Sequence, residues 1–501
     1  MSVFLNAQSG GFKREYKLPN AFQNVAKAVF ETTPNNYIMG GFVFDTLNGS
    51  YTNRLTLFGI NQQGQRTWTK KYGSSKFEYL DNLWVSRWFY KQGSNLYHAG
   101  CVRDSNNKYL GVLIKFNLNG DSIWQNKFYD DNYDVIPLMV TGSVDGGFLI
   151  TGYVQQVGNQ PVLLIKTNVV GNELWRKYIN KSGTNTHDGK AIIQDTSSKK
   201  IIIVGHQKFG NDYKDNILIC DSLGNKLSQN SYCGSLGGWL NDLIQTKDKK
   251  IVAVGKAIYP QIFSGSNLTR SYAVKFDFNS PESPIWKIDN FDKLAKGNSF
   301  TCVRELNNEV LLFSGGLDTM QQNSLPLNGL NRMTKFDKNG NMLWNRHYDY
   351  SKNPNANNNI TTRSLNLAIN GDWLAAIQIG NASPDPFFFV RYDSTGCDST
   401  SLYCTTTFTS NIYEVSNNAY HLVIYPNPVK STLNLSFSNL KFITQNLTFK
   451  ILDVYGRVIR EDEIKIETQN SLNISDLEKG IYFMQLYNMN KLIATKKIMK
   501  E

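Results

Sequence analysis

One short phrase recurs along most of this chain, and the repeat constrains the fold more than any other feature. The phrase is an Asn or Asp, two residues, a Gly, three residues and a Trp, and it follows an apolar segment. Complete copies occupy residues 61–68, 117–124, 168–175 and 337–344. Degenerate copies occupy residues 221–228, 277–286 and 393–400. Seven copies at a period of about 55 residues are typical of a repeat fold.

Each copy is predicted to form a turn between two antiparallel strands. An Asn or Asp at the first turn position bonds to the backbone two residues later, and Gly adopts a positive φ. Another apolar strand precedes each phrase, for example over residues 147–152 and 200–205, and an alternating strand opens each unit. Four-stranded units at this period, with no helical pattern between them, indicate an all-β fold. We therefore predict a seven-bladed β-propeller over residues 10–404.

The repeated Trp is expected to fill the gap between neighbouring blades, and its loss to cost about 3–5 kcal/mol. The chain ends of the repeat region indicate how the ring closes. Phe12 and Tyr16 have the spacing of Trp68 and Tyr72, with Phe in place of Trp, whereas the last copy has no Trp at position 400. We therefore expect residues 12–18 to supply the outermost strand of the seventh blade, because pairing the two ends hides open sheet edges.

Residues 421–501 follow a different pattern. They contain a Tyr-Pro-Asn-Pro turn, alternating strands, two glycines near strand ends and a basic carboxyl end. These motifs comprise Tyr425, Pro426, Asn427, Pro428, Gly456, Gly480, Tyr482, Lys496 and Lys497. In their order and spacing they resemble the type A C-terminal sorting domain of type IX secretion.

The resemblance implies a small β-sandwich that directs export from a Gram-negative bacterium, by way of the periplasm, to the cell surface or the medium. It also implies handling by the type IX machinery, removal of the tail by a sortase-like peptidase, and attachment of the product to surface lipopolysaccharide. Residues 405–420, rich in Thr, Ser and Asn, are expected to form a linker. Residues 1–9 are interpreted as the remnant of a secretion signal that starts further upstream.

The six cysteines fit an exported protein. Cys397 and Cys404 flank a short loop, and we expect a disulfide between them in an oxidising compartment. The others lie in strand-like segments and are interpreted as small buried side chains: Cys101, Cys220, Cys233 and Cys302. Their spacing predicts no metal site, and no motif implies a cofactor. No apolar segment has the length of a membrane helix, and we expect no nucleic-acid partner.

Two sets of residues are candidates for a ligand-binding face. A basic residue recurs just before the repeated turn, at Lys115, Lys166, Lys275, Lys335 and Arg391. At matching points of a ring these residues would attract an anionic glycan or phosphate, which also suits the net charge of +12. The alternative is that each stem packs on its blade and each charged head reaches solvent or an Asp.

Three tryptophans lie outside the repeated position: Trp84, Trp88 and Trp239. Trp239 follows two glycines at the start of a blade, so it is a candidate for the ring face, where binding surfaces favour Trp. Packing in the core is the alternative for each of the three. Insertions at residues 258–269 and 319–331 lengthen loops of two neighbouring blades, where recognition is often found.

The sequence contains no paired carboxylates, Ser/His/Asp set or Cys/His set that indicates catalysis. We therefore expect a binding protein, an adhesin or scaffold for a protein or glycan, rather than an enzyme. The alternatives are a propeller hydrolase or lyase acting on polysaccharide, and a purely structural module of the envelope. An enzyme should have a deep axial pocket with clustered carboxylates, whereas a binding protein should present a shallow face with aromatic residues and long loops.

Overall fold

The structure, a computed structural model, divides into two compact units, Met1–Thr405 and Thr406–Glu501. It describes residues 11–47, 49–74, 77–79, 87–155, 160–180, 186–209, 212–233, 237–259, 268–291, 295–306, 309–319, 329–350, 360–379, 386–398, 421–438, 447–453, 457–464, 469–488 and 491–501. Among these residues no helix is long and apolar enough to cross a membrane.

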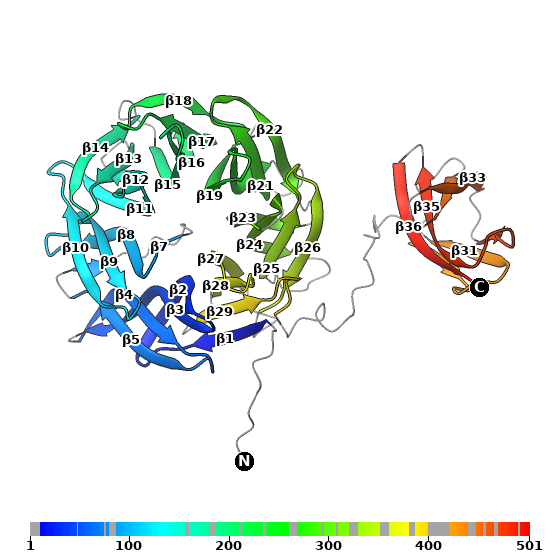
Figure 1. Cartoon of the computed structure of the whole chain (residues 1–501), viewed down its shortest axis with the longest axis horizontal. Helices are drawn as coiled ribbons and strands as arrows, with labels where there is room; N and C mark the ends of the chain where they lie inside the picture. The colour runs from blue at the N-terminus through cyan, green and yellow to red at the C-terminus, as the bar shows by residue number, and fades with distance from the viewer. Residues whose placement is uncertain are drawn as a thin grey trace, which may run out of the picture. The chain divides into compact units, whose positions relative to one another are not determined.

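The first unit consists of antiparallel sheets that follow one another along the chain and are arranged radially around an axis (Figure 1). Three sheets comprise β2 (Ala21–Thr33), β3 (Asn36–Leu47), β4 (Ser50–Ile60) and β5 (Arg66–Tyr72); β6 (Glu78–Tyr79), β7 (Phe89–Gln92), β8 (Asn95–Arg103), β9 (Tyr109–Asn117) and β10 (Ser122–Phe128); and β11 (Asp134–Gly142), β12 (Phe148–Gln155), β13 (Val162–Thr167) and β14 (Glu173–Ile179). Of these strands, β2, β7 and β11 lie nearest the axis in Figure 1. This is the architecture of a β-propeller.

The remaining sheets continue the same pattern. They comprise β15 (Thr186–Gln194), β16 (Ile201–Phe209), β17 (Asp212–Cys220) and β18 (Lys226–Asn230); β19 (Gly238–Gln245), β20 (Ile251–Tyr259), β21 (Leu268–Asp277) and β22 (Ser280–Phe291); β23 (Ala295–Glu305), β24 (Leu311–Thr319), β25 (Gly329–Phe336) and β26 (Met342–Tyr348); and β27 (Ile360–Leu367), β28 (Trp373–Ile379) and β29 (Phe387–Tyr392). The units that begin at β19 and β23 form one eight-stranded sheet through a single parallel bridge, Thr269 to Gly297. Dividing that sheet at the bridge separates these two units among the described residues, and the count of seven blades stays a prediction.

The ring closes between the two ends of the first unit. Strand β1 (Phe12–Tyr16) pairs with β29, with Phe12 opposite Arg391 and Tyr16 opposite Phe387. It therefore forms the outer strand of the sheet that contains β27, and Figure 1 shows the two differently coloured chain ends side by side. The predicted closure by the amino-terminal segment is confirmed. This pairing covers the outer edge of β29, and β1 becomes the edge strand of the sheet.

The repeated Trp and Gly belong to one contact between adjacent sheets, which we call the clasp. A Cβ placed on Gly120 would lie 2.5 Å from the ring of Trp68, and one on Gly224 would lie 2.7 Å from the ring of Trp175. Glycine is required twice over, because φ at these turns is also positive, +77° and +79°. The same Trp-on-Gly contact joins Trp124 to Gly171, Trp286 to Gly340 and Trp344 to Gly396.

The aromatic residue four positions after the Trp completes several clasps. The Tyr72 hydroxyl donates to the Gly120 carbonyl, and Tyr16, which follows Phe12, donates to Gly64 at 3.1 Å. Where Ser228 replaces the Trp, Tyr232 still donates to a carbonyl of the next sheet, that of Pro281. The rest of the core lies between sheets, for example Ile201–Val204 of β16, which are fully buried. The Trp rings themselves are only half-buried.

The second unit is a small β-sandwich. One sheet contains β30 (His421–Tyr425), β31 (Thr432–Ser438) and β34 (Gln469–Asn473), and the other contains β33 (Val458–Ile464), β32 (Leu447–Leu452), β35 (Gly480–Asn488) and β36 (Lys491–Lys500). Alternating side chains such as Leu433, Phe449 and Met484 form a separate apolar core. The Tyr-Pro-Asn-Pro turn is tied to β36, because the Asn427 side chain accepts from Met499 N and donates to Lys497 O, at 2.8 and 2.7 Å.

The other motif residues of this unit lie on or beside its strands. Gly480 opens β35, where the Tyr482 hydroxyl donates to the Glu478 carbonyl at 3.0 Å. Lys496 and Lys497 lie on β36, with Lys497 exposed. Gly456 lies outside the residues that the structure describes.

Candidate functional site

The recurring basic residues occupy equivalent places in their sheets. Four of them lie on the next-to-last strand of their sheet, directly opposite the repeated Trp of the last strand. These pairs are Lys115 with Trp124, Lys166 with Trp175, Lys275 with Trp286, and Lys335 with Trp344. Arg391 on β29 lies opposite Phe12, which takes the Trp position in the closing strand.

Three of these cations are buried and hold a turn of their own sheet. The Lys166 amine lies 2.6 Å from a carboxylate oxygen of Asp145, and the Lys275 amine lies 2.6 Å from Asp248. Arg391 binds Asp372 at 2.8 Å. Each Asp is in the hairpin between the first two strands, so the ion pair fixes the turn to the third strand. This arrangement matches the alternative in which the charged head reaches an Asp.

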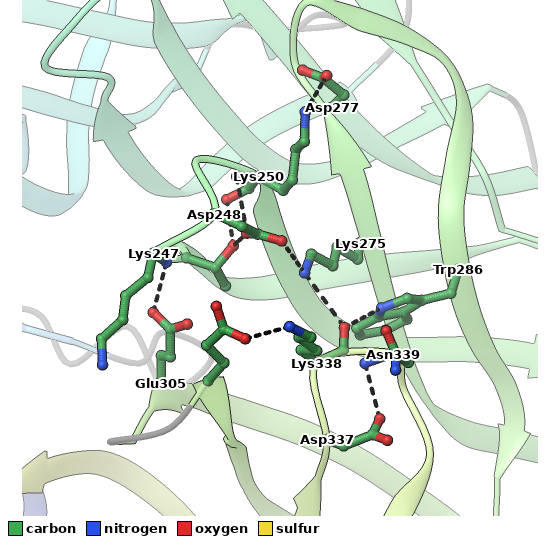
Figure 2. A network of polar contacts seen from close by, with 12 residues as sticks. Lys247, Asp248, Lys250, Lys275, Asp277, Trp286, Glu305, Asp337, Lys338 and Asn339 are labelled. Carbon is green, nitrogen blue, oxygen red and sulfur yellow. Dashed lines mark hydrogen bonds and ion pairs between the residues drawn. The ribbon is translucent and has the colours of Figure 1, made fainter.

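Figure 2 shows how one such pair joins a clasp. The carbonyl of Lys338, in the turn of the following sheet, accepts hydrogen bonds from Trp286 Nε1 at 3.0 Å and from the Lys275 amine at 3.4 Å. Burial acts to raise the pKa of Asp248, but hydrogen bonds from Lys275 and Thr246 outweigh it and lower that pKa below its ordinary value. The charges in this region therefore stabilise contacts between neighbouring sheets.

The remaining members of the set lie over aromatic rings. The Lys115 amine is 5.9 Å from the Tyr97 ring centroid, and the Lys335 amine is 5.9 Å from that of Trp373. None of the five recurring cations is among the described residues that line the two cavities near the axis considered below. The structure thus places them equivalently without bringing them together, and their role as ligand contacts stays a prediction.

The tryptophans outside the repeat have different surroundings. Trp88 is buried, with its ring stacked on that of His98 at 5.7 Å between centroids and with the Lys27 amine 4.9 Å from its centroid. Trp239 lies near the start of β19, an innermost strand, and lines a cavity of about 120 Å³ beside the axis. Trp84 and most of both loop insertions lie outside the described residues.

This axial pocket is lined mainly by residues of the innermost strands. Its lining includes Lys190 of β15, Trp239 and Asn241 of β19, Lys256 of β20, Asn298 and Thr301 of β23, and Thr361 and Arg363 of β27. Several of its polar side chains tie adjacent strands together. Asn241 donates to the Phe300 carbonyl at 3.0 Å, and Thr301 donates to the Thr362 carbonyl at 2.6 Å. These bonds make the wall rigid.

The charged lining of the axial pocket is basic. The Lys256 amine lies 4.0 Å from the ring centroid of Trp239, and the Lys190 amine lies 5.6 Å from it. The third cation, Arg363, donates to Gln378 at 2.8 Å through Nε. Among the described residues that line this pocket there is no Asp or Glu.

A buried group behind the pocket supports Lys190. Burial lowers the pKa of Lys190, the Asp188 carboxylate acts to raise it, and the nearby Arg363 lowers it further. Asp188 is itself buried and lies 2.8 Å from His206 Nδ1. The His206 and Tyr213 rings lie 6.1 and 5.8 Å from the Trp239 ring centroid. Burial thus disfavours the charged form of Lys190, and the Asp188 carboxylate partly offsets this effect.

A second cavity, of about 430 Å³, lies at the other end of the same innermost strands. Its lining includes Arg304 of β23 and Asn366 of β27, which follow the residues of the first pocket along each strand. Here the fully buried Asp242 binds Arg87 at 2.9 Å and Arg304 at 3.1 Å. Both arginines are thus engaged by one buried carboxylate.

Sequence reasoning singled out Trp239 but not Lys190, Lys256 or Arg363. These three residues lie on strands of three different sheets, and no local pattern marks them. Cys101, Cys220 and Cys302 are buried, as their strand positions predict. The same interpretation is wrong for Cys233, which is only half-buried because it lies in the connection after β18. Cys404 lies outside the described residues, so its pairing with Cys397 stays a prediction. Within the described part of the chain, no group of three or more His, Cys, Asp or Glu could hold a metal ion.

Comparison with known families identifies the carboxyl-terminal unit. Residues 423–501 match the family model of the secretion system C-terminal sorting domain. The tail is therefore a type IX sorting domain. The protein is handled by the type IX secretion machinery and is exported to the cell surface or the medium. No curated protein matches the chain.

Solved structures similar to this chain include β-propellers. The β-propeller domain of the Trilobed protease from Pyrococcus furiosus has 9% identity and a TM-score of 0.38, with 73% of this chain and 96% of that chain covered. The WD40 domain of SCAP from fission yeast has 8% identity and a TM-score of 0.31, covering 76% and 98%. The extracellular domain of a hybrid two-component system from B. thetaiotaomicron has 10% identity and a TM-score of 0.33, covering 95% and 72%.

Proposed function

We propose that this exported propeller is a surface binding module that recognises a saccharide at the axial pocket containing Trp239. The observation that carries this proposal is the combination of a Trp ring with amines and hydroxyl groups in one concave site on a rigid scaffold. Aromatic faces pack against apolar sugar faces, while polar groups fix orientation. The ring of sheets holds these residues in place without a loop having to close.

Hydrolysis is a less suitable function for this pocket. Glycoside hydrolases position two carboxyl groups about 5–9.5 Å apart across the scissile bond. The described lining of the axial pocket contains no Asp or Glu, and Asp188, behind it, is occupied by His206. The described lining therefore offers groups that bind a sugar but not the pair of carboxyl groups that cleaves one by hydrolysis.

A polysaccharide lyase is the second candidate, and a specific observation favours it. Burial lowers the pKa of Lys190, and a lysine with a lowered pKa can act as a general base. Arg363, close to it, would neutralise a uronate carboxylate during proton removal. Incubating the protein with acidic polysaccharides and measuring the ultraviolet absorbance of an unsaturated product separates this function from binding alone.

Export completes the proposal. The sorting domain is removed after transport through the periplasm and the outer membrane, by a sortase-like peptidase, and the propeller is attached to surface lipopolysaccharide. Deleting residues 421–501 should leave the protein in the periplasm. Mass spectrometry of the mature protein from its host should find no peptide from this segment, and recovery of tail peptides at the cell surface would contradict removal.

A glycan array tests the binding function directly. The full chain should bind a subset of glycans, and Trp239→Ala should abolish this signal. Trp175→Ala is the matched control, because Trp175 has the same side chain in a clasp away from the pocket. Glycan binding that Trp239→Ala leaves intact would overturn the assignment of the pocket, and the absence of any bound glycan would overturn the saccharide-binding function.

A further inference from the structure

The charge of the axial pocket narrows the class of saccharide beyond the proposed function. Three cations reach it from three different sheets: Lys190 on β15, Lys256 on β20 and Arg363 on β27. Like charges gathered in one cavity repel one another and favour a negative ligand. The described residues that line the pocket include no Asp or Glu, and the Asp188 carboxylate lies behind Lys190.

Lys190 lies where burial disfavours its charged form. Only 5% of Lys190 is exposed, and burial lowers its pKa. Removing a charge from water is costly unless an opposite charge lies nearby. Asp188 supplies part of this compensation from behind. A ligand anion in the cavity would supply the rest on the open side.

Trp239 provides an aromatic surface for a sugar next to the amine of Lys256. The Lys256 amine lies 4.0 Å from its ring centroid. An anion bound to Lys256 therefore lies against the indole, and the carbon skeleton that bears the anion is within reach of the ring. Hydroxyl groups of Thr361 and Thr269 complete the lining. This combination suits an acidic sugar better than a small inorganic anion, which has no apolar surface to bury.

The size of the cavity sets how much of a saccharide can enter. Its volume of about 120 Å³ is well below the roughly 300–1,000 Å³ of a pocket that encloses a whole drug-sized ligand. A chain of several sugars must therefore remain outside. One sugar unit, with its charged substituent inward, is what the pocket can hold.

We infer that the axial pocket recognises a single acidic unit of a saccharide, through the carboxylate of a uronic acid or a sulfate ester bound by Lys190, Lys256 and Arg363 against Trp239. This inference rests on the proposed saccharide-binding function. It adds that the negative substituent is the group the protein selects, and that the neutral sugar skeleton contributes less.

Calorimetric titration of the full chain tests this inference with defined oligosaccharides. One arm uses uronic-acid oligomers and their carboxyl-reduced counterparts, and the other uses sulfated oligomers and their desulfated counterparts. Loss of one charge-assisted hydrogen bond should weaken binding at least about tenfold. We expect that loss for the neutral counterparts, and a similar loss for the variant Lys256→Met with the charged oligomer. The arm with the tighter charged ligand identifies the substituent.

Two controls make the result specific. Lys127 lies on the outer strand β10, where its amine is 3.9 Å from the ring centroid of Phe77. Lys127→Met lowers the net charge of the protein by the same amount as Lys256→Met, but it should leave binding unchanged. Thermal unfolding of each variant checks that it is folded. Inorganic sulfate and acetate serve as competitors and should compete weakly.

The outcomes separate this inference from the proposed function. Equal binding of charged and neutral oligomers, with Trp239→Ala inactive and Lys256→Met unaffected, would overturn the acidic-unit inference and leave saccharide binding intact. Sulfate that competes as well as the sulfated oligomer would overturn the saccharide component in favour of a simple anion site. Binding lost equally in Lys127→Met would show a nonspecific charge effect and would also overturn the inference.

Discussion

The same side chain serves two different ends in the clasps and in the axial pocket. In a clasp, Trp175 lies on an outer strand and covers Gly224 of the next sheet, so closely that no Cβ would fit. In the pocket, Trp239 lies on an innermost strand and meets the amines of Lys190 and Lys256. The role of each Trp depends on the residues that it contacts. A Trp against a glycine backbone packs two sheets together, whereas a Trp beside charged groups around a cavity can take part in ligand recognition.

The lysines make the same contrast. Lys166 on the third strand is buried and bound to Asp145 of its own sheet, whereas Lys256 lines the axial pocket beside Trp239. Outer charges of this kind fix turns of their own sheets, and the inner charges face a cavity. Four predictions test this division between a structural rim and a binding centre, in order of decreasing effect on stability.

Removing the closing strand should have the largest effect. Deletion through Lys17 eliminates β1 together with the buried Tyr16, which donates to Gly64 in the adjacent sheet. We expect a loss of more than about 4 kcal/mol in the free energy of unfolding, because a large buried aromatic and a whole strand pairing are lost. Urea unfolding measures it, with removal of only the residues before Gly11 as the control. An unchanged midpoint would show that the ring is stable without β1.

A methyl group in a clasp should be the next most damaging change. Gly224→Ala combines a φ of +79° with a Cβ 2.7 Å from the Trp175 ring, and we expect a loss of about 2–4 kcal/mol. Gly371→Ala is the matched control, since its φ is +89° but no atom lies within 4 Å of the added Cβ. It should cost only about 1 kcal/mol of backbone strain. Equal losses would show that the Trp contact contributes nothing.

Truncating the two tryptophans should separate stability from binding. Trp175→Ala should lower the free energy of unfolding by about 2–3 kcal/mol, at or below the low end of the sequence-based expectation because the ring is half-buried. Trp239→Ala should cost less stability but abolish glycan binding. Chemical denaturation and the glycan array are measured on the same preparations. A variant of Trp175 that loses binding while folded would break the comparison.

The smallest expected effect is the pH dependence of a rim ion pair. Burial acts to raise the pKa of Asp145, but hydrogen bonds from Lys166 and the Gly147 amide outweigh it and lower that pKa below its unfolded value. A lowered carboxyl pKa contributes stability above the unfolded pKa of about 3.9, and this stability is lost as pH falls through the folded pKa. Asp145→Asn should therefore unfold with a shallower acid dependence. Identical thermal midpoints of wild type and variant at pH 3 and at pH 7 would contradict this.

Much of the fold could be predicted because the repeat is local. The Asx-x-x-Gly turns, the Trp that follows and the Phe12–Tyr16 echo of Trp68–Tyr72 all lie within a few residues of one another. Their spacing therefore indicated the strands, the contact between sheets and the closing strand. The sorting motifs at Tyr425 to Pro428 and Gly480 were equally easy to recognise in the sequence. The export machinery must recognise a sorting signal within one small domain, so its motifs lie close together.

The sequence by itself determined the propeller, its means of closure and its export. Only the tertiary structure decided which cations share a cavity. Lys190, Lys256 and Arg363 are distant in the chain and meet because the innermost strands converge on one axis. Lys166 and Lys275 are equally basic in the sequence, but they form ion pairs with Asp145 and Asp248 of their own sheets. The physical reason is that a charge acquires its role from its neighbours in space, and a radial fold chooses those neighbours across sheets rather than along the chain.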